Sequence, residues 1–523
     1  MNKIKLLTLT TLTCLSLGLS GCRLSFNRGG DIDNGGETEK QDVEVTKISL
    51  SATTANVYVG KTFSLTPTVS PSNASNTNVT WKSSNTSVAT VTNGLITGVK
   101  AGNCTVTATS VSNKNVSATC NVTVKEASTI NEAAWTILIY MCGSDLESEN
   151  GLATSDLQEI ASVSGQTSDY NVVIEAGGAK SWSSTYSYVI NKSYLNRFHL
   201  SNRKYVKDAQ ITKANMGQSS TLQSFLEWGI TTYPAEKYGI ILWNHGGGMQ
   251  GVCYDENYNY DTLLNNEVVA AVKGARNSLG ISEKFEFIGY DACLMGLQDV
   301  DDFDSPYFNY MASSQESENG YGWDYDTWLD DLFAGKDTNT ILKAIADGFI
   351  NDNGGVNASG GYDEDYSYYP ADQTFSYYDL SKMDTYRTAW EDMAAQLRKK
   401  ITNDTIAKNF NKIIAKTKYF AEDDYPYFSE FDAYHFVTLL EDDSTFNPGS
   451  TYTNAVKKAL KELVVYNVTQ NEAAHDAYGI SFYYVADTSN GQSKYSTSTY
   501  SNFTNWSYLS NKYGGSITSS YSY

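Results

Sequence analysis

Two apolar runs in the middle of the chain, each followed at once by a reactive residue, constrain the fold most strongly. Residues 238–243 lead into His245 and three glycines, and residues 285–290 lead into Asp291 and Cys293. Apolar residues at helical spacing lie between the two runs, which predicts a strand–helix–strand unit. Parallel strands joined in this way end at the same edge of a sheet. We therefore expect the thiol and the imidazole to meet there as a nucleophile and its proton acceptor.

The surroundings of Cys293 distinguish it from the other cysteines. Residues 294–297 read as the first turn of a helix, and a helix N-terminus lowers the pKa of a thiol. Cys142 and Cys253 have no special flanks and are expected to be buried. Among the histidines, only His245 both follows an apolar strand and precedes glycines, which let a substrate backbone approach closely. The others are expected to be packed or solvated: His199, His435 and His475.

Length and charge limit the classes of protein that this chain can be. Its 523 residues and hydrophobic fraction of 41% predict several domains with a large core. The net charge of −21 argues against nucleic acid as a partner, because phosphate binding requires a basic face. No CxxC or HExxH spacing indicates zinc. Acidic runs occur at 299–304 and 363–365, but such runs are usually solvated loops, so neither a metal site nor a cofactor is predicted.

The N-terminus predicts export. Lys3 and Lys5 precede an apolar stretch, residues 6–19, that is too short to span a membrane. The tetrapeptide that follows, Leu19-Ser20-Gly21-Cys22, resembles the bacterial lipobox, in which cleavage leaves a lipid-modified cysteine. This resemblance predicts a lipoprotein signal peptide over residues 1–21 and lipid on Cys22. Residues 22–42 are then a flexible tether, and the protein is held at a bacterial cell envelope.

Residues 43–126 have a different character. Val, Thr and Ser alternate in short runs between turn signals, which predicts a small all-β sandwich. The segments 81–85 and 94–102 resemble bacterial immunoglobulin-like modules. A spacer is the preferred interpretation of this domain, and adhesion is the alternative. Cys104 and Cys120 lie on two runs that could pair as a hairpin, either as a disulfide or as two unpaired core residues.

From residue 130 to residue 490, strand and helix patterns alternate. Apolar strands are expected at 135–141 and 170–175, with a helix at 145–162, in addition to the central unit. This alternation predicts an α/β domain with a mostly parallel sheet and helices on both faces. A second apolar set after residue 377 is mostly helical. The last stretch, 491–523, is rich in Ser and Tyr and is treated as a tail.

Several motifs in this region, in order, resemble the clostripain family of cysteine peptidases. The resemblance covers roughly residues 130 to 490 and implies a caspase-like fold, which gingipains and legumains share. The matching segments are Trp135–Met141, Asn244–Gly248, Tyr290–Gly296, Trp323–Tyr325 and Phe375–Met383.

The family resemblance assigns roles to these residues. It implies that Cys293 attacks the scissile carbonyl to form a thioester and that His245 protonates the leaving amine. The backbone N–H groups of Gly246 and Cys293 would form the oxyanion hole. Family members cleave after Arg or Lys, and Asp291 would line the pocket for that side chain. The expected partners are therefore proteins or peptides that carry Arg or Lys before the cleaved bond.

The sequence is compatible with further properties. Some members of the resembled family need calcium, which the acidic runs 299–304 and 363–365 could bind, although no defined metal site is predicted. Family members are made as precursors that cut themselves after a basic residue between His and Cys, and three such residues occur here: Lys273, Arg276 and Lys284. A surface adhesion or scaffold protein could use a peptidase-like fold for binding alone. A transpeptidase could resolve the thioester with an amine instead of water.

Overall fold

The computed structural model describes residues 42–60, 62–125, 132–351, 373–421, 429–470, 475–485 and 501–515. The predicted signal peptide, Cys22, almost all of the tether and the acidic run 363–365 lie outside these residues. Among the described helices, none has the length and apolar character needed to cross a membrane.

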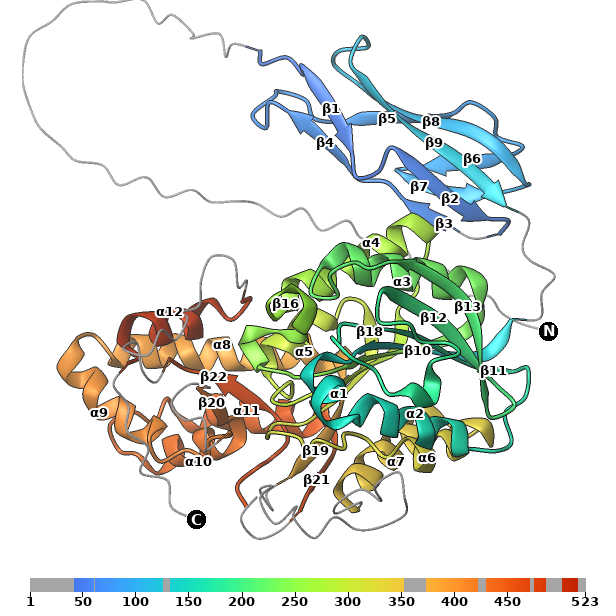
Figure 1. Ribbon diagram of the computed structural model, residues 1–523. Helices are drawn as coiled ribbons and strands as arrows, with labels where there is room; N and C mark the ends of the chain where they lie inside the picture. The colour runs from blue at the N-terminus through green and yellow to red at the C-terminus, as the bar shows by residue number, and fades with distance from the viewer. Residues whose placement is uncertain are drawn as a thin grey trace, which may run out of the picture.

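An all-β domain precedes the large domain (Figure 1). Its strands are β1 (Lys47–Leu50), β2 (Thr54–Tyr58), β3 (Thr62–Ser64), β4 (Pro67–Ser70), β5 (Val79–Ser83), β6 (Ala89–Thr92), β7 (Leu95–Gly98), β8 (Gly102–Ser110) and β9 (Ser117–Lys125). A sheet of order β2-β9-β8-β5 packs on one of order β3-β7-β6, and β1 pairs with β4. Strands β8 and β9 form the expected antiparallel pair, and Cys104 and Cys120 on them are buried free thiols. The immunoglobulin-like sandwich is therefore confirmed.

A nine-stranded sheet forms the centre of the large domain, in the order β13-β12-β11-β10-β14-β17-β18-β19-β21. The central strands β11, β10, β14, β17 and β18 run parallel, and antiparallel strands extend both edges. The strands are β10 (Ala133–Cys142), β11 (Tyr170–Gly177), β12 (Tyr194–Ser201), β13 (Lys204–Thr212), β14 (Ala235–Trp243), β17 (Phe285–Asp291), β18 (Phe308–Ser313), β19 (Thr374–Asp379) and β21 (Val464–Thr469). The strand–helix–strand unit predicted from the sequence is thus at the centre of the sheet.

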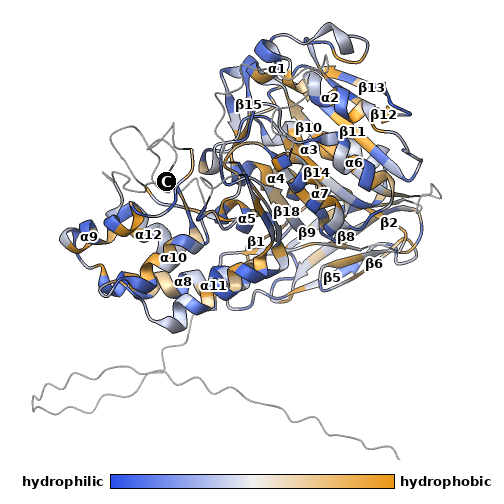
Figure 2. Cartoon of the chain, turned by 90° about the horizontal axis from the view of Figure 1, so that it is seen from below, coloured by the Kyte–Doolittle hydropathy of each residue, from blue (hydrophilic) through white to orange (hydrophobic). Residues whose placement is uncertain are grey.

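Helices cover both faces of this sheet, as predicted (Figures 1 and 2). The helices of this part of the chain are α1 (Ser144–Asn150), α2 (Leu152–Ser162), α3 (Ser219–Thr232), α4 (Asn265–Leu279), α5 (Gln298–Asp304), α6 (Tyr325–Phe333) and α7 (Thr338–Asn351). Successive side chains of a strand point to opposite faces, so Leu138 and Tyr140 pack with α3 and α4 while Ile137 and Ile139 pack with α2, α6 and α7. Figure 2 shows the apolar residues concentrated on the strands and on the helix sides that face them.

A second group of helices follows β19. These are α8 (Met383–Lys400), α9 (Asp404–Ile414), α10 (Ala433–Asp442), α11 (Ser450–Leu463) and α12 (Thr504–Tyr513), with a short sheet of β20 (Glu430–Asp432) and β22 (Ser481–Tyr483) among them. Helix α12 lies inside the segment treated as a tail, yet Trp506 is fully buried against Trp390, Phe436 and Phe482. Glu391 on α8 accepts hydrogen bonds from the first backbone N–H groups of α12. The large domain therefore extends to α12.

Two further elements differ from the sequence prediction. The single helix expected over 145–162 is two helices, because Gly151 adopts a left-handed conformation (φ 71°) that ends α1 and starts α2. The hairpin of β12 and β13 was not predicted, since its second strand alternates polar residues with few apolar ones.

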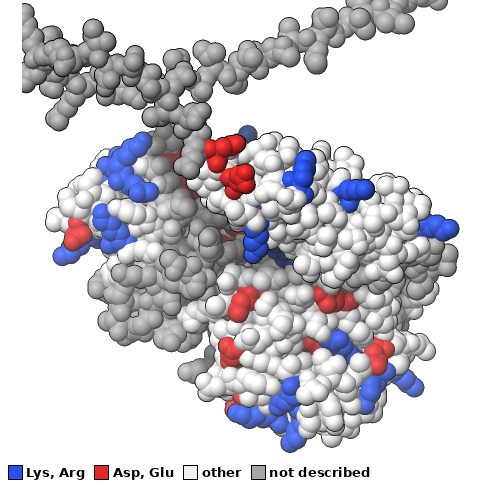
Figure 3. Space-filling view, turned by 90° about the horizontal axis from the view of Figure 1, so that it is seen from above, with Lys and Arg blue, Asp and Glu red and all other residues white. Residues whose placement is uncertain are grey.

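On the face seen in Figure 3, Lys and Arg side chains lie in separate groups with Asp and Glu side chains between them.

Candidate active site

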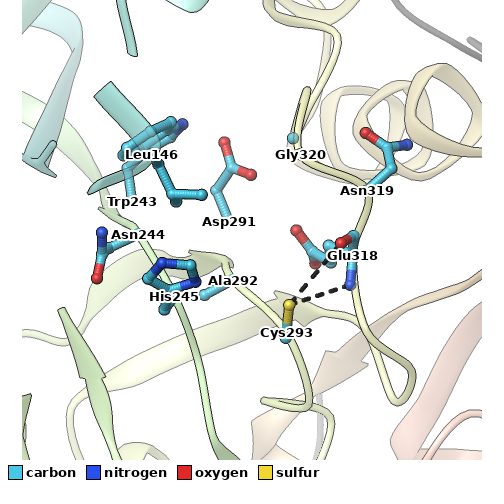
Figure 4. Close-up of a pocket in the computed structure, with 11 residues that line it drawn as sticks. Leu146, Trp243, Asn244, His245, Asp291, Ala292, Cys293, Glu318, Asn319 and Gly320 are labelled. Atoms are coloured by element: carbon cyan, nitrogen blue, oxygen red, sulfur yellow. Dashed lines mark hydrogen bonds between the residues drawn. The ribbon is translucent and has the colours of Figure 1, made fainter. Parts of the chain in front are cut away.

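The reactive residues converge where the parallel strands end. Strands β10, β14 and β17 finish level with one another, since Trp243 lies opposite both Met141 and Asp291 in the register. The loops after these strands and after β18 surround a cavity of about 220 Å³ (Figure 4). It is lined by Leu146, Trp243, Asn244, His245, Asp291, Ala292, Cys293, Glu318, Asn319, Gly320 and Gly322. The predicted meeting of His245, Asp291 and Cys293 at one edge thus occurs in the structure.

Hydrogen bonds hold the His245 loop on three sides. The backbone N–H of Asn244 donates to the Asp291 carbonyl at 3.2 Å, and its side-chain Nδ2 donates to the Cys142 carbonyl at 2.7 Å. The Oδ1 of Asn244 accepts from the backbone N–H of Tyr254 at 2.7 Å. The side chain of Asn244 therefore ties the imidazole loop to the end of β10, and its backbone ties the loop to the end of β17.

The acidic partner of the imidazole, Asp145, was not predicted from the sequence. Nε2 of His245 lies 3.1 Å from Oδ1 of Asp145, and the two side chains are 38% and 29% exposed. Hydrogen bonding to His245 lowers the pKa of Asp145 to about 2, so this carboxylate stays charged at any ordinary pH. With Nε2 engaged by Asp145, Nδ1 is the ring nitrogen left to exchange a proton with a nucleophile. Asp145 follows β10, whose end lies at the same sheet edge, and that position was the signal available in the sequence.

The prediction that Cys293 starts a helix is wrong. Helix α5 begins only at Gln298, and Leu294 has a left-handed backbone (φ 65°) that no α-helical turn contains. The backbone N–H groups of Leu294 and Gly296 instead donate to the carbonyls of Glu316 and Ser314. Cys293 therefore sits in a tight loop fixed to the segment after β18.

The expected lowering of the thiol pKa is also wrong for this state of the protein. Burial, followed by the charge of Glu318, raises the pKa of the Cys293 thiol to about 12. The backbone N–H of Glu318 donates to Sγ at 3.2 Å, and Sγ lies 3.8 Å from the Glu318 carbonyl oxygen. Within the described residues no hydrogen bond joins Sγ to His245, although both side chains face the same cavity (Figure 4).

Gly246 lies against the backbone of Cys293. A β-carbon at this position would come within 2.1 Å of the Cys293 carbonyl oxygen, so only glycine fits. Gly246 forms a bridge with Val252 whose hydrogen bonds are made by its neighbours His245 and Gly247. In such a pair the N–H of Gly246 points away from the paired strand, and its interaction with the Cys293 thiol opposes the rise in the thiol pKa.

Two acids form the acidic end of the cavity. Asp291 is 3% exposed, and burial raises the pKa of its carboxyl to about 7. The Tyr325 hydroxyl donates a hydrogen bond to this carboxyl at 2.8 Å, which lowers the pKa but does not outweigh the effect of burial. Glu318 faces it from the segment after β18, and burial together with Asp291 raises the pKa of Glu318 well above its usual range. Glu318 was not singled out in the sequence, because no reactive neighbour marks it. In their ionised forms these two carboxyl groups can accept charge-assisted hydrogen bonds from a cationic group.

The walls of the cavity leave room for a long side chain. Trp243 lines one side, and its indole N–H donates to the buried carboxylate of Asp156 at 2.5 Å. Gly322 has a positive φ of 67°, and a β-carbon there would lie 2.7 Å from Oδ1 of Asp291. The absence of a side chain at Gly322 therefore keeps the acidic end open.

The other residues considered in the sequence lie away from this cavity. His199 contacts Asp208 and Tyr233, and both His435 and His475 lie near Asp476. The acidic run 299–304 is the buried helix α5 rather than a solvated loop, and among the described residues no group of three or more His, Cys, Asp or Glu is placed to hold a metal ion.

The basic residues between His245 and Cys293 lie in ordered elements. Lys273 and Arg276 are within α4, where Arg276 is buried and donates to the Ser282 carbonyl. The Nζ of Lys284 donates to the Ser305 carbonyl at 2.6 Å. Peptidases bind extended chain, so cleavage at Lys273 or Arg276 would require local unfolding of α4.

An α/β sheet whose strand ends present a thiol, an imidazole with a carboxylate partner and a buried acidic pocket is the architecture of a cysteine hydrolase. A family model described as the clostripain family matches residues 139–513, and the chain belongs to this family. The chain is thus a cysteine endopeptidase, as expected from the sequence.

The individual relatives agree with this assignment. Clostripain of Hathewaya histolytica is 25% identical over 407 residues, which cover 69% of this chain and 76% of clostripain. A secreted C11 cysteine protease from Bacteroides thetaiotaomicron, solved in complex with an irreversible peptide inhibitor, superposes with a TM-score of 0.50 at 16% identity over 72% of this chain and 99% of its own. This structural likeness concerns the fold.

The N-terminal domain has relatives of its own. A model of bacterial immunoglobulin-like domains of group 2 matches residues 44–126. An uncharacterized protein of Clostridium acetobutylicum is 43% identical over 83 residues, which cover 16% of this chain and 9% of that protein.

Proposed function

We propose that this cysteine endopeptidase cleaves peptide bonds after Arg or Lys, with Cys293 as nucleophile and His245 as its acid–base partner. The observation that carries the proposal is the pair of buried acids, Asp291 and Glu318, in the cavity that also contains the Cys293 side chain. A buried carboxylate binds a guanidinium or ammonium group by charge-assisted hydrogen bonds far better than it binds a neutral group. The same specificity is what the family resemblance implies.

The substrate side chain enters between Trp243 and the two acids. The apolar stem of Lys or Arg packs on the indole, and the cationic head approaches Asp291 and Glu318. Because both acids have raised pKa values, the bound cation favours their ionised forms and releases a proton from the pair. Neutral and acidic side chains leave the acidic end unpaired.

The chemical steps follow from the positions of the side chains. Sγ of Cys293 gives its proton to Nδ1 of His245 and attacks the carbonyl carbon, and the oxyanion is met by the backbone N–H groups of Gly246 and Cys293. His245 then protonates the leaving amine, which leaves a thioester. Water attacks the thioester with His245 as the base, and the acid product and free thiol are regenerated. Asp145 holds the imidazole through Nε2 and stabilises its charged form.

We also propose that lipid on Cys22 holds the enzyme at a bacterial cell envelope. The N-terminal charge, the short apolar stretch and the lipobox-like tetrapeptide support this. The immunoglobulin-like domain would then act as a spacer between the envelope and the peptidase domain. Expression of the full chain and of Cys22→Ala, followed by separation of membrane and soluble fractions, tests the anchor. The wild type should sediment with membranes and the variant should not, and equal distribution would disprove the anchor.

Peptide cleavage tests the catalytic proposal directly. The protein lacking residues 1–22 is incubated with peptides that differ only in the residue before the reporter group, which is Arg, Lys, Ala or Asp. We expect cleavage after Arg and Lys alone, and none by the Cys293→Ala variant. Cleavage after Ala that depends on Cys293 would retain the nucleophile and reject the acidic pocket. If all four peptides stay intact, even after limited trypsin treatment and with added calcium, the proposed specificity and roles are wrong.

A further inference from the structure

Glu318 contacts the nucleophile and the specificity pocket at the same time. Its backbone N–H donates to Sγ of Cys293 at 3.2 Å, and its carbonyl oxygen is 3.8 Å from the same atom. Its side chain lines the cavity together with Asp291, and Figure 4 shows it extending from its own segment toward the space beside Ala292 and Cys293. One residue therefore connects the group that binds the substrate cation to the atom that attacks the peptide.

The charges around Sγ are unbalanced when the cavity is empty. Glu318 and Glu316 face Sγ from the segment after β18, Asp291 lies two residues before it on β17, and His245 approaches from β14. Glu316 is occupied in structural hydrogen bonds from the N–H groups of Ser317 and Ala421. Both carboxylate oxygens of Glu318 are buried and lack a partner of normal hydrogen-bond geometry within the described residues. A thiolate formed here would add a further negative charge to an acidic enclosure.

We propose that Glu318 makes ionisation of Cys293 depend on a cation in the specificity pocket, so that the enzyme forms its thiolate only when a Lys or Arg side chain is bound. At a pH at which the Glu318 carboxylate is ionised, the cation offsets the negative charge that faces Sγ, and the proton moves from Sγ to His245. By linkage the effect is reciprocal, and a thiolate also tightens binding of the cation. Glu318 thus links recognition of the substrate cation to activation of the nucleophile. This inference rests on the proposed specificity for basic side chains.

Such coupling has two consequences for the resting enzyme. A neutral peptide that enters the cavity meets a protonated thiol, so the basic side chain contributes to kcat as well as to KM. A protonated thiol also reacts poorly with oxidants and electrophiles, which protects a partly exposed cysteine in an exported protein.

The pH dependence of alkylation tests the coupling without any peptide. Iodoacetamide is small and neutral and reacts with the thiolate, so its rate against pH reports the ionisation of Cys293 after subtraction of the rate of Cys293→Ala. Methylguanidine serves as the cation, and its binding is checked by competition with an arginine peptide. We expect methylguanidine to move the midpoint of the profile of the wild type down by about one pH unit. An unchanged midpoint at a concentration that blocks peptide cleavage would overturn the proposal.

Two matched variants test whether the coupling depends on Glu318 or would follow from the loss of any glutamate charge. Glu318→Gln should have a lower midpoint than the wild type without any cation, and methylguanidine should then move it by much less. Glu462→Gln, the same change on the exposed side of α11, should behave as the wild type. If Glu318→Gln keeps the wild-type midpoint and response, the coupling does not pass through Glu318. If Glu318→Gln does not fold, the shift of the wild-type midpoint with methylguanidine still tests whether a bound cation promotes ionisation of Cys293.

The two proposals fail in different ways. Cleavage after Arg, together with an alkylation profile that methylguanidine does not change, would retain the specificity and reject the coupling. Cleavage that ignores the basic residue, with no competition by methylguanidine, would reject the pocket and with it the coupling.

Discussion

The two carboxylates that flank the thiol and the imidazole occupy opposite environments. Asp145 is partly exposed and bonded to His245, and that hydrogen bond lowers its pKa to about 2. Asp291 is buried, and burial raises its pKa to about 7. The first is a fixed charge that can orient an imidazole at every physiological pH. The second is only partly ionised near neutral pH, and a bound cation favours its ionised form. The same residue type therefore orients the imidazole at one position and recognises the substrate at the other.

Removal of the buried charge should have the largest effect. Asp291→Asn keeps the shape of the pocket but leaves a substrate cation poorly paired, and we expect kcat/KM for arginine peptides to fall about 100-fold or more. The measurement compares an arginine peptide with an alanine peptide for both proteins. A uniform loss on both peptides would mean that Asp291 supports the catalytic loop rather than the pocket.

Removal of the exposed charge should affect a different parameter. Asp145→Asn loses the charged partner of Nε2, and kcat should fall about 10- to 100-fold with KM for arginine peptides nearly unchanged. Steady-state kinetics over a range of arginine peptide concentrations separate the two terms. A rise in KM alone would place Asp145 in substrate binding and end the contrast with Asp291.

Binding of a small guanidinium should depend on pH through the buried acid. Since the pKa of Asp291 is raised to about 7, the carboxylate is ionised only above that pH. The inhibition constant of methylguanidine should therefore fall by up to about tenfold per pH unit as pH rises toward 7, and level off above it. Asp291→Asn should flatten this profile, while Asp145→Asn, whose carboxylate does not titrate in this range, should preserve it.

Thermal stability should give the smallest effect, with opposite signs for the two acids. A raised folded-state pKa means that the native protein holds its proton more tightly, so Asp291 costs stability as pH rises from the unfolded value near 4 to about 7. Asp291→Asn should raise Tm at pH 8 by roughly 2–4 °C and change it little at pH 4. Asp145 has a lowered pKa, so its stabilising contribution is present at pH 8 and disappears only as pH falls toward 2.

Melting curves of both variants at pH 8 and pH 4 decide this prediction. A lower Tm of Asp291→Asn at pH 8 would show that its hydrogen bond from Tyr325 outweighs the cost of burying its charge.

The central part of the site could be predicted because it follows from strand order alone. The apolar runs before His245 and Asp291 form adjacent parallel strands, and adjacent parallel strands must finish at one edge. Asp145 follows β10 and Glu318 follows β18. The pairing of these two strands with the central strands cannot be predicted from the local sequence pattern. A carboxylate after a strand is common, and only the tertiary arrangement brings these two beside the imidazole and the thiol.

The conformation after Cys293 could not be read from local pattern either. Residues 294–297 have helical composition, but hydrogen bonds to the segment after β18 impose a left-handed residue at Leu294. Tertiary contacts outweigh propensity over so short a stretch. Helix α12 was missed for a related reason, because a Ser- and Tyr-rich segment gains its stability from the burial of Trp506 rather than from its average composition.

The position of α12 also bears on when the enzyme can form during its synthesis. Trp506 completes an aromatic cluster with residues of α8, α10 and β22, and Trp390 of α8 precedes it in the chain by 116 residues. Because a growing chain leaves the ribosome in sequence order, α8 and α10 are made well before α12 can cover them. This part of the core therefore closes late relative to the helices that form it, and the domain gains its full packing only after α12 has been made.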